Sequence, residues 1–412
     1  MTSPSDLTAL EAKQQLLRSR LRAALAGRPA EVTPIDVDVV ITPAEVNYRH
    51  GTGSLVRTMF GEGDGILSIR SIDFYEREHS FGQWAIRLDH SDGSREQAVR
   101  RVSNVLRGFS PKRVFCIPYH ADELYTAIAI NEIFGASLTA HLMDDGNLYS
   151  QLIPDELMRE FLRRCSVRFA ISSQMRDAYE EKYGLEVSVC PPLVPDELVK
   201  NDAARPSLEH GVMVGNLWSE KWSGWLRQTI AESGQRVDWY GSRQLAMQAS
   251  TDELEKDGIV SRGLIAEQEL AARLADYPFA IVPTGMLDPD DDRNAIGRLS
   301  LPSRIVFTLA CSNTPMIVVG SPDSAAALFV TGFGIGVCCD YQVESFRKAV
   351  EHVTASDVQA KMRGRAAELA TSFSARGISE WLWAAAECGG PIDRRFEDLM
   401  PRAGVREVRD VV

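Results

Sequence analysis

Hydrophobic positions along the chain fall into short apolar runs that are separated by polar loops and amphipathic stretches. From residue 37 onward, β-branched runs such as DVDVVIT, GILSI, RVFCIP, SLTAHLM and VRFAIS are each followed by a polar loop or a helical segment such as ELYTAIAINEIF. Strand-length runs that alternate with helix-length segments are typical of βα units, whose strands form a parallel sheet. The pattern therefore predicts an α/β protein with doubly wound sheets.

The alternation is interrupted once, in the segment VCPPLVPDELVKNDAARPSLEH, where Pro191, Pro192, Pro195 and Pro206 cluster before an apolar strand that begins at Gly211. Such a proline-rich stretch is typical of a linker. After it the scheme repeats, with strands in GVMVGN, VDWYG, GIVSRG, FAIVPT, PMIVVG and GIGVCC and helices near 222–232, 267–275, 302–310 and 343–353. We expect two Rossmann-like domains, residues 35–200 and 201–370, that face each other across a cleft.

Both ends of the chain predict helices outside these domains. Residues 7–26 place leucines on one helical face with arginines and a lysine elsewhere, so residues 1–34 should form an amphipathic helix. Such a helix rests on a membrane surface, or packs on this chain or a second subunit; packing is favoured because partner helices give the same pattern. Residues 371–412 should carry terminal helices, with an apolar stripe in ISEWLWAAAEC, followed by a tail.

The amino-acid composition limits the kinds of binding partner that we expect. The 412 residues carry a formal charge of -12, which argues against a broad basic surface for nucleic acid, so an anionic ligand must meet a local cluster of cations. Seven cysteines without a CxxC pair indicate reduced, buried thiols. No secretory signal and no apolar run of about 20 residues is found. We expect a cytoplasmic protein, or one peripheral to the inner membrane face.

The loops that follow the predicted strands carry the candidate chemistry, because ligands of doubly wound sheets collect at the carboxyl ends of the strands. In the first half these loops supply a glycine-containing stretch, a histidine and two adjacent carboxylates: Gly51, Thr52, Gly53, Ser54, His120, Asp144 and Asp145. The carboxylates either act as base or orient hydroxyl groups, or they form an Asx turn at Gly146. His120 is either a general base or a structural residue.

In the second half the corresponding loops supply cations and a helix start. The candidates are Asn216, Lys221, Arg262, Gly263, Arg298, Ser303 and Arg304. A diphosphate needs several fixed cations and N–H donors, and the stretch NAIGRLSLPSRIVFTLA reads as a polar loop that leads into a helix whose free N–H groups point back at the loop. The acidic run DPDDDRN lacks spaced partners, so we interpret it as a solvated loop and expect no metal site.

Taken in order, GTGSLV, HLMDD, FAISSQMRDAYEEKYGLEVSVCPP, GNLWSEKW and LPSRIVFTLACSNTPMIVVG resemble the two-domain GT-B glycosyltransferases, nearest to the retaining, family-four-like branch, over roughly residues 35–370. The most specific part is LPSR, which is similar to the family's LPSK. The resemblance implies that Ser303 and the N–H groups beside it hold the diphosphate of a nucleotide-sugar, with Arg304 at the motif's lysine position and no cofactor besides this donor substrate. The resemblance also implies that the terminal helices of residues 371–412 cross back to the first domain.

Two positions depart from the family pattern. Phe307 stands where the motif has the glutamate that commonly binds the nucleotide ribose, and Leu299 stands where the EX7E pattern has its other glutamate. The resemblance implies transfer of a sugar to a saccharide or lipid-linked acceptor, as in polysaccharide biosynthesis. Asp144 or His120 takes the acceptor proton in an inverting enzyme, and the leaving phosphate does so in a retaining one. A nucleotide-sugar epimerase and a catalytically silent scaffold stay open as alternatives.

Overall fold

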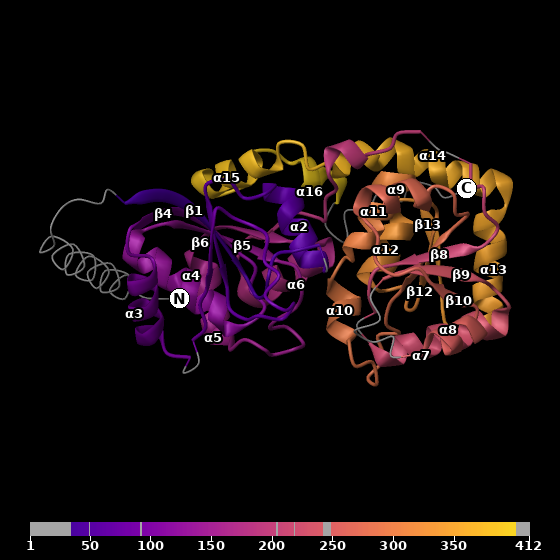
Figure 1. Ribbon diagram of the computed structural model, residues 1–412, viewed down its shortest axis with the longest axis horizontal. Helices are drawn as coiled ribbons and strands as arrows, with labels where there is room; N and C mark the ends of the chain where they lie inside the picture. Colours follow the sequence, from indigo (N-terminus) through magenta and orange to yellow (C-terminus); the bar gives the residue numbers. More distant parts are fainter. Residues whose placement is uncertain are drawn as a thin grey trace, which may run out of the picture.

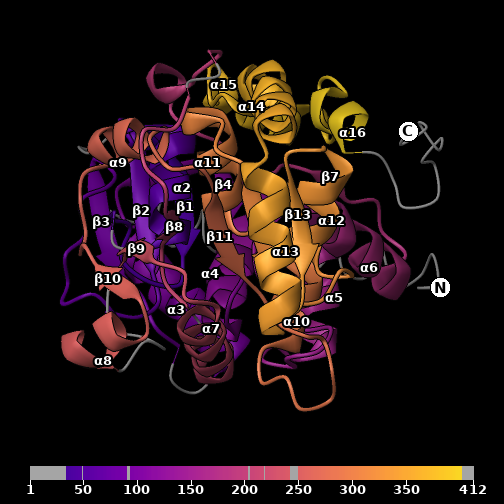
Figure 2. The same ribbon diagram turned by 90° about the vertical axis from the view of Figure 1, so that its right-hand side faces the viewer.

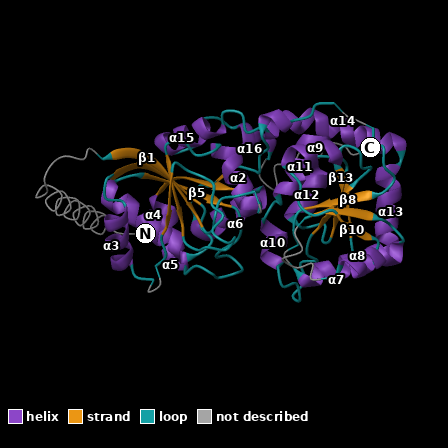
Figure 3. Cartoon of the chain, in the orientation of Figure 1, coloured by secondary structure: helices purple, strands orange, loops and turns teal. Residues whose placement is uncertain are grey.

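The computed structural model describes residues 34–48, 50–90, 93–202, 205–217, 219–241 and 249–400. The amphipathic helix predicted over residues 7–26 and the tail from residue 401 lie outside these ranges. The described chain forms two α/β units that lie next to each other, with the helices packed around two central sheets (Figure 1, Figure 3).

The first sheet is parallel throughout and has the strand order β3-β2-β1-β4-β5-β6-β7. Its strands are β1 (Ile35–Thr42), β2 (Ile66–Arg70), β3 (Trp84–Arg87), β4 (Phe109–Cys116), β5 (Ser137–Leu142), β6 (Cys165–Ala170) and β7 (Ser188–Val189). Its helices are α2 (Gly51–Phe60), α3 (Arg95–Val105), α4 (Ala121–Phe134), α5 (Asp155–Arg164) and α6 (Ser173–Tyr183). Central strands such as β5 are buried on both faces, which is why they read as continuous apolar runs.

The second sheet is also parallel, with the order β10-β9-β8-β11-β12-β13. Its strands are β8 (Gly211–Val214), β9 (Val237–Tyr240), β10 (Ile259–Ser261), β11 (Ala280–Pro283), β12 (Met316–Val319) and β13 (Gly336–Cys339). Its helices are α7 (Glu220–Ser233), α8 (Thr251–Lys256), α9 (Glu267–Leu274), α10 (Asn294–Leu299), α11 (Ser303–Ser312), α12 (Ala325–Gly332), α13 (Val343–Thr354) and α14 (Ser356–Ala370). This strand order is that of a Rossmann fold.

The predicted α/β architecture of two Rossmann-like, doubly wound domains is confirmed. The sequence pattern missed the short edge strands β3 and β7. It was also wrong about the segment from Asn294 to Leu299, which is helix α10 and not a polar loop. This helix has only six residues and contains Gly297, so its sequence shows no helical periodicity. Packing against α12 and α6 holds it in place.

The chain returns to the first domain after α14. A 3-10 turn (Thr371–Phe373) leads to Ser374, which bridges to Val194 of the linker, and then to α15 (Ile378–Cys388) and α16 (Arg395–Leu399). Helix α15 contacts β5, β6 and α2 of the first domain, as seen along the upper side of both ribbon views (Figure 1, Figure 2). The side chains of Trp381 and Trp383 are buried there.

The cysteines carry no disulfide. The expectation that all seven are buried was wrong for Cys338, which is half-buried, and for Cys388, which is exposed near the end of α15. Within the described ranges, none of the helices combines the length and the apolar character that crossing a bilayer requires.

Candidate functional site

The two domains meet where the first helical turns of α2 and α11 come together. A Cβ atom placed on Gly51 would lie 3.2 Å from Oγ of Ser303, so the helix N-termini lie almost in contact across the domain boundary. Neither first turn contains an acidic residue. The first N–H groups of a helix have no acceptor within it, and its N-terminus carries partial positive charge. Two such ends directed at one place form a site suited to an anion.

His50 organises the start of α2. Its Nε2 donates to the carbonyl of Glu45 at 2.7 Å, so its Nδ1 is free to accept from the N–H of Gly53 at 3.3 Å. The ring stacks on Tyr75 at 4.5 Å between centroids, and burial lowers the pKa of His50. A neutral imidazole with a fixed tautomer therefore caps the helix and leaves the N–H groups of Gly51 and Thr52 to other acceptors.

Gly53 and Ser54, the other two candidate residues at the start of α2, have different surroundings. Gly53 is buried, and a side chain there would overlap the backbone of Asn47, so this glycine allows α2 to pack on its own preceding loop. This packing alone accounts for a glycine at position 53, and the approach of Gly53 to a ligand stays a prediction. The hydroxyl of Ser54 hydrogen-bonds to the carboxylate of Glu267, the first residue of α9 in the second domain.

Arg304 lies in the first turn of α11 and reaches the carboxyl ends of β8 and β11. Its Nη1 donates to the carbonyl of Asn216 at 2.7 Å and its Nη2 to that of Pro283 at 3.5 Å, while the buried Nε has no partner. Among the described residues it forms no ion pair with a carboxylate. Burial lowers the pKa of Arg304 to about 10. The guanidinium therefore stays charged at neutral pH.

The remaining predicted donor residues lie at strand ends but have protein partners. Nζ of Lys221 donates to the carbonyl of Asp290, and Arg298 donates to Asn294 Oδ1 at 2.6 Å and to the carbonyl of Leu287 at 3.1 Å. Arg262 forms an ion pair of 3.1 Å with Asp238, and the following Gly263 adopts a left-handed φ of 72°. The structure therefore brings Ser303, Arg304 and Asn216 together, and ties Lys221 and Arg298 to the loop that follows β11.

That loop is ordered by a buried carboxylate. Asp291 accepts from Nε1 of Trp222 at 2.9 Å and from the N–H groups of Arg293 at 3.0 Å and Leu287 at 3.3 Å, and is 7% exposed. A side chain on Gly285 would overlap this carboxylate. The interpretation of DPDDDRN as a solvated loop was therefore wrong for Asp291, because composition alone does not reveal how a carboxylate is paired.

Asp144 lies across the boundary from these residues. Its Oδ2 accepts from the hydroxyl of Tyr119 at 2.6 Å and its Oδ1 from the hydroxyl of Ser300 at 2.7 Å, and Tyr119 lies 3.0 Å from Oγ of Thr52. Burial raises the pKa of Asp144, against the lowering effect of the two hydroxyl groups. The sequence reading missed Tyr119 and Ser300, although Tyr119 directly precedes His120 at the end of β4.

His120 and Asp145 have structural partners. His120 occupies the N-cap position of α4, 3.6 Å from the carboxylate of Glu123, and the hydrogen bond with Glu123 raises the pKa of His120. Asp145, predicted to face the acceptor, points instead into its own loop. It accepts from the N–H groups of Asn147, Leu148, Tyr149 and Ser150 and from the hydroxyl of Tyr179. This is the Asx-type arrangement left open by the sequence.

No cluster of three or more potential metal ligands exists within the described ranges. The polar groups of this region are helix N–H donors, the half-buried guanidinium of Arg304 and a chain of hydroxyl groups around the carboxylate of Asp144.

A scan against protein-family models finds no match for the chain, and a search of the curated proteins finds no relative. Solved structures do match. HepE from Anabaena in complex with UDP has a TM-score of 0.60 at 12% identity, covering 85% of this chain and all (100%) of that one. A UDP-N-acetylglucosamine 2-epimerase from Listeria monocytogenes, described as putative in its own report, has a TM-score of 0.54 at 12% identity, covering 89% and 98%.

MurG from Acinetobacter baumannii also matches, with a TM-score of 0.52 at 10% identity, covering 84% of this chain and 99% of that one. Identities this low bear on the fold alone. Together with the two sheet orders, the matches show that this chain has the GT-B fold, with two Rossmann-like domains.

Proposed function

We propose that this protein is a glycosyltransferase that moves a sugar from a nucleotide-diphosphate-sugar to a hydroxyl acceptor without a metal ion. The observation that carries the proposal is the half-buried guanidinium of Arg304, which has no carboxylate partner among the described residues and belongs to the first turn of α11, the helix whose N-terminus meets that of α2. A buried cation without a counter-ion is costly in a folded protein. A diphosphate bound there supplies the missing charge and accepts from the free N–H groups.

The proposed mechanism follows from where charge develops. When the bond from the anomeric carbon to the donor phosphate breaks, the departing nucleoside diphosphate gains negative charge. Arg304, Ser303 and the first N–H groups of α11 then bind the leaving group more strongly than they bind the intact donor, and such differential binding lowers the barrier. Gly51 and Thr52 on the opposite helix close the site from the acceptor side.

A UDP-sugar is the donor class that we propose, since HepE is described in complex with UDP and the Listeria protein is named for a UDP-sugar. Phe307 is half-buried against the core and has no group that could accept from a ribose hydroxyl. Glu267 is a candidate replacement, because it is the first residue of α9, which packs against α11, the helix of Phe307, and burial raises the pKa of Glu267.

We propose a retaining reaction, as in the family-four-like branch. Asp144 accepts from the hydroxyl groups of Tyr119 and Ser300, and Tyr119 contacts Thr52, so in this proposal the carboxylate positions hydroxyl groups and does not act as the base. In a retaining transfer the leaving phosphate accepts the acceptor proton, so no free carboxylate is needed. The proton NMR spectrum of the product tests this: an anomeric configuration opposite to that of the donor would exclude retention.

Epimerisation of a nucleotide-sugar is the second candidate, because two-domain 2-epimerases share the fold at coverage as high as that of the transferases. It predicts turnover of a UDP-sugar without any acceptor. A silent scaffold predicts UDP binding without turnover. The acceptor that we propose is a saccharide, free or lipid-linked, in polysaccharide biosynthesis in the cytoplasm, with residues 7–26 as the contact to a membrane or to a second copy.

The decisive experiment is a thermal-shift panel of UDP, GDP and dTDP and their sugars, with and without EDTA. A ligand at a hundredfold its dissociation constant stabilises the protein by about 2.7 kcal/mol. We expect UDP to raise the melting temperature with EDTA present, and Arg304→Met to abolish the shift. If no nucleotide stabilises the parent protein, the proposal is wrong. Release of UDP only with an added saccharide would favour the transferase over the epimerase.

A further inference from the structure

Exposed aromatic rings are concentrated at one edge of the first domain. In the part of the chain that the structure describes, three aromatic side chains are more than half exposed: Tyr48 at 59%, Phe74 at 57% and Tyr149 at 57%. All three lie in loops at the carboxyl ends of β1, β2 and β5, the edge from which Gly51 and Asp144 contact the second domain. Exposed rings gathered beside a candidate site indicate a binding surface.

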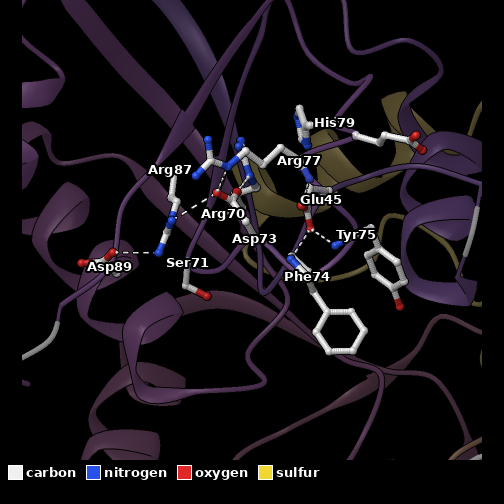
Figure 4. Close-up of polar contacts among 12 residues, drawn as sticks. Glu45, Arg70, Ser71, Asp73, Phe74, Tyr75, Arg77, His79, Arg87 and Asp89 are labelled. Atoms are coloured by element: carbon white, nitrogen blue, oxygen red, sulfur yellow. Dashed lines mark hydrogen bonds and ion pairs between the residues drawn. The ribbon is translucent and has the colours of Figure 1, made fainter. Parts of the chain in front are cut away.

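The loop that carries Phe74 is held by a buried carboxylate. Glu45 is 0% exposed and accepts from the N–H groups of Phe74 at 2.8 Å, Tyr75 at 3.0 Å and Arg77 at 2.9 Å (Figure 4). Burial alone would raise the pKa of Glu45, but these N–H groups lower it below its ordinary value. The carboxylate therefore stays ionised and fixes the backbone on both sides of the Phe74 ring.

The same loop stores backbone strain. Glu76 and Arg77 have φ values of 56° and 66°, in the left-handed region that side chains other than glycine avoid. Strain of this kind persists only where the surroundings impose it, and it concentrates at functional sites. Here the consequence is that Phe74 stands out from the surface, with its ring edge-on to Tyr75 at 4.9 Å and Tyr75 stacked on the His50 cap of α2.

The loop that carries Tyr149 has the same construction. Asp145, at 6% exposure, accepts from four successive N–H groups, that of Tyr149 at 2.7 Å among them. Gln151 follows with a left-handed φ of 49°. Two buried carboxylates therefore shape two loops, and each loop presents one exposed ring to solvent.

The sheet order fixes how the two loops are arranged. They follow β2 and β5, and β1 and β4 lie between those strands. Three inter-strand spacings of about 4.8 Å separate the loops by roughly 14 Å at the sheet. The start of α2, which follows β1, and Tyr119, which follows β4, come from the two strands between these loops, and Tyr119 donates to Asp144 of the loop after β5. A ligand that contacts both rings therefore spans the ends of β1 and β4, the strands that lead to α2 and to Tyr119.

We propose that Phe74 and Tyr149 bind the rings of a saccharide acceptor more than one sugar long, and this rests on the glycosyltransferase function proposed above. A pyranose presents C–H groups of partial positive charge on its flat faces, which fit the negative face of an aromatic ring. Its hydroxyl groups point outward to polar neighbours. On the protein, single exposed rings are separated by hydroxyl and N–H groups, which matches the apolar faces and polar edges of successive sugars. A lipid chain would instead need a continuous apolar surface.

The test compares Phe74→Ala, Tyr149→Ala and the double variant with the ring-preserving Phe74→Trp and Tyr149→Phe. Ile392→Ala, at a 51% exposed position between α15 and α16, is the control. Binding of cello-, malto- and chito-oligosaccharides of one to four sugars is measured by saturation-transfer NMR with UDP present. We expect affinity to rise with chain length in the parent, each alanine to weaken tetrasaccharide binding about tenfold, and the double variant about a hundredfold, because distant sites add.

The ring-preserving variants and the control should bind like the parent, and UDP affinity should stay unchanged in every variant. Equal binding of one and four sugars, no saccharide signal across the panel, or unaltered binding in both alanine variants would each overturn the inference. A loss of UDP affinity in Phe74→Ala would also overturn it, because the ring would then belong to the donor site. Failure of the parent to bind UDP is a separate result, which removes the proposed function itself.

Discussion

Oγ of Ser300 donates to Oδ1 of Asp144 over 2.7 Å and thereby joins the second domain to the first. One turn before α11, the hydroxyl of Ser172 likewise donates to the carbonyl of Leu299. These contacts flank the place where Gly51 meets Ser303, so the geometry of the anion site depends on how the two domains are held together.

Asp144→Asn should raise the stability of the protein at neutral pH. The folded pKa of Asp144 lies above its ordinary value, so the folded state binds the proton more tightly than the unfolded state does, and stability falls as the pH rises from about 3.9 through the folded pKa. The asparagine removes this charge and keeps hydrogen bonds to both hydroxyl groups. Because Asp144 opposes the acid destabilisation that the buried histidines cause, lowering the pH from 7 to 4 should lower the melting temperature of the variant more than that of the parent.

The same variant separates the two mechanisms. Under the retaining proposal, Asp144→Asn loses less than about tenfold in the transfer rate, since the leaving phosphate accepts the proton. A loss of about 100-fold or more, the size of a general-base contribution, would mark Asp144 as the base of an inverting enzyme. Ser300→Ala serves as the control, because it breaks the domain contact and keeps the carboxylate.

Arg304→Met should remove the UDP-induced thermal shift without lowering the melting temperature of the free protein. The substitution takes away an enclosed charge that has no carboxylate partner, and replacing such a charge by an apolar side chain of similar length costs folding little. Arg304→Lys should keep part of the shift, because the charge remains but the planar two-pronged donor is lost. Ser303→Ala should cost about 1 kcal/mol of binding.

The matched control for this series is Arg365→Met, which changes an exposed arginine of α14. Wild-type UDP affinity in Arg304→Met would place the diphosphate elsewhere. A large drop in the melting temperature of the free variant would instead show that Arg304 supports the fold through its bonds to Asn216 and Pro283.

The fold was predictable because each strand is a local feature of the sequence. Runs such as PMIVVG are apolar along their whole length, and parallel strands buried on both faces must read that way. The exceptions have equally physical reasons: β7 spans only Ser188–Val189, and α10 contains Gly297, so neither shows a period.

The candidate site was less predictable because its chemistry depends on which groups pair in space. Arg304 and Arg262 look alike in sequence, yet only Arg262 meets a carboxylate, from Asp238. Asp144 and Asp145 are adjacent, but one bridges the domains and the other shapes a loop. No local pattern specifies such partners, and the role of Ser303 and Asn216 in a donor site stays a prediction from their positions after strands.

Acid should destabilise the protein through His141. This fully buried residue of β5 donates through Nε2 to the carbonyl of Cys190 at 3.0 Å, and burial lowers the pKa of His141 to about 4. The unfolded state, with a pKa near 6.5, binds the proton more readily, so stability is complete above about pH 6.5 and is lost as the pH falls toward 4. The loss should be about 3 kcal/mol.

Urea unfolding at several pH values measures this effect, and His141→Gln, which keeps a donor to Cys190, should flatten the dependence. His50 and His79 also have lowered pKa values from burial and act in the same direction, so some slope will remain in the variant. An unchanged slope would show that His141 does not titrate in this range.

Helix α15 should be indispensable to the first domain even though it follows the second in sequence. Its buried side chains include Trp381, which packs on Phe169 at 5.1 Å, and Trp383, which lies 5.2 Å from Phe60 of α2. Trp381→Ala should cost about 3–5 kcal/mol of stability through the cavity that it leaves, whereas Glu380→Ala on the exposed side of the helix should change little.

Truncation after Ser374 removes the whole contact, so the apolar surface over β5 and β6 becomes exposed and the protein should aggregate. Because α15 also contacts α2, a milder loss such as that in Trp383→Phe should disturb the anion site, which UDP titration of the folded variant would detect. A truncated chain that stays soluble and binds UDP like the parent would show that the first domain does not need this helix.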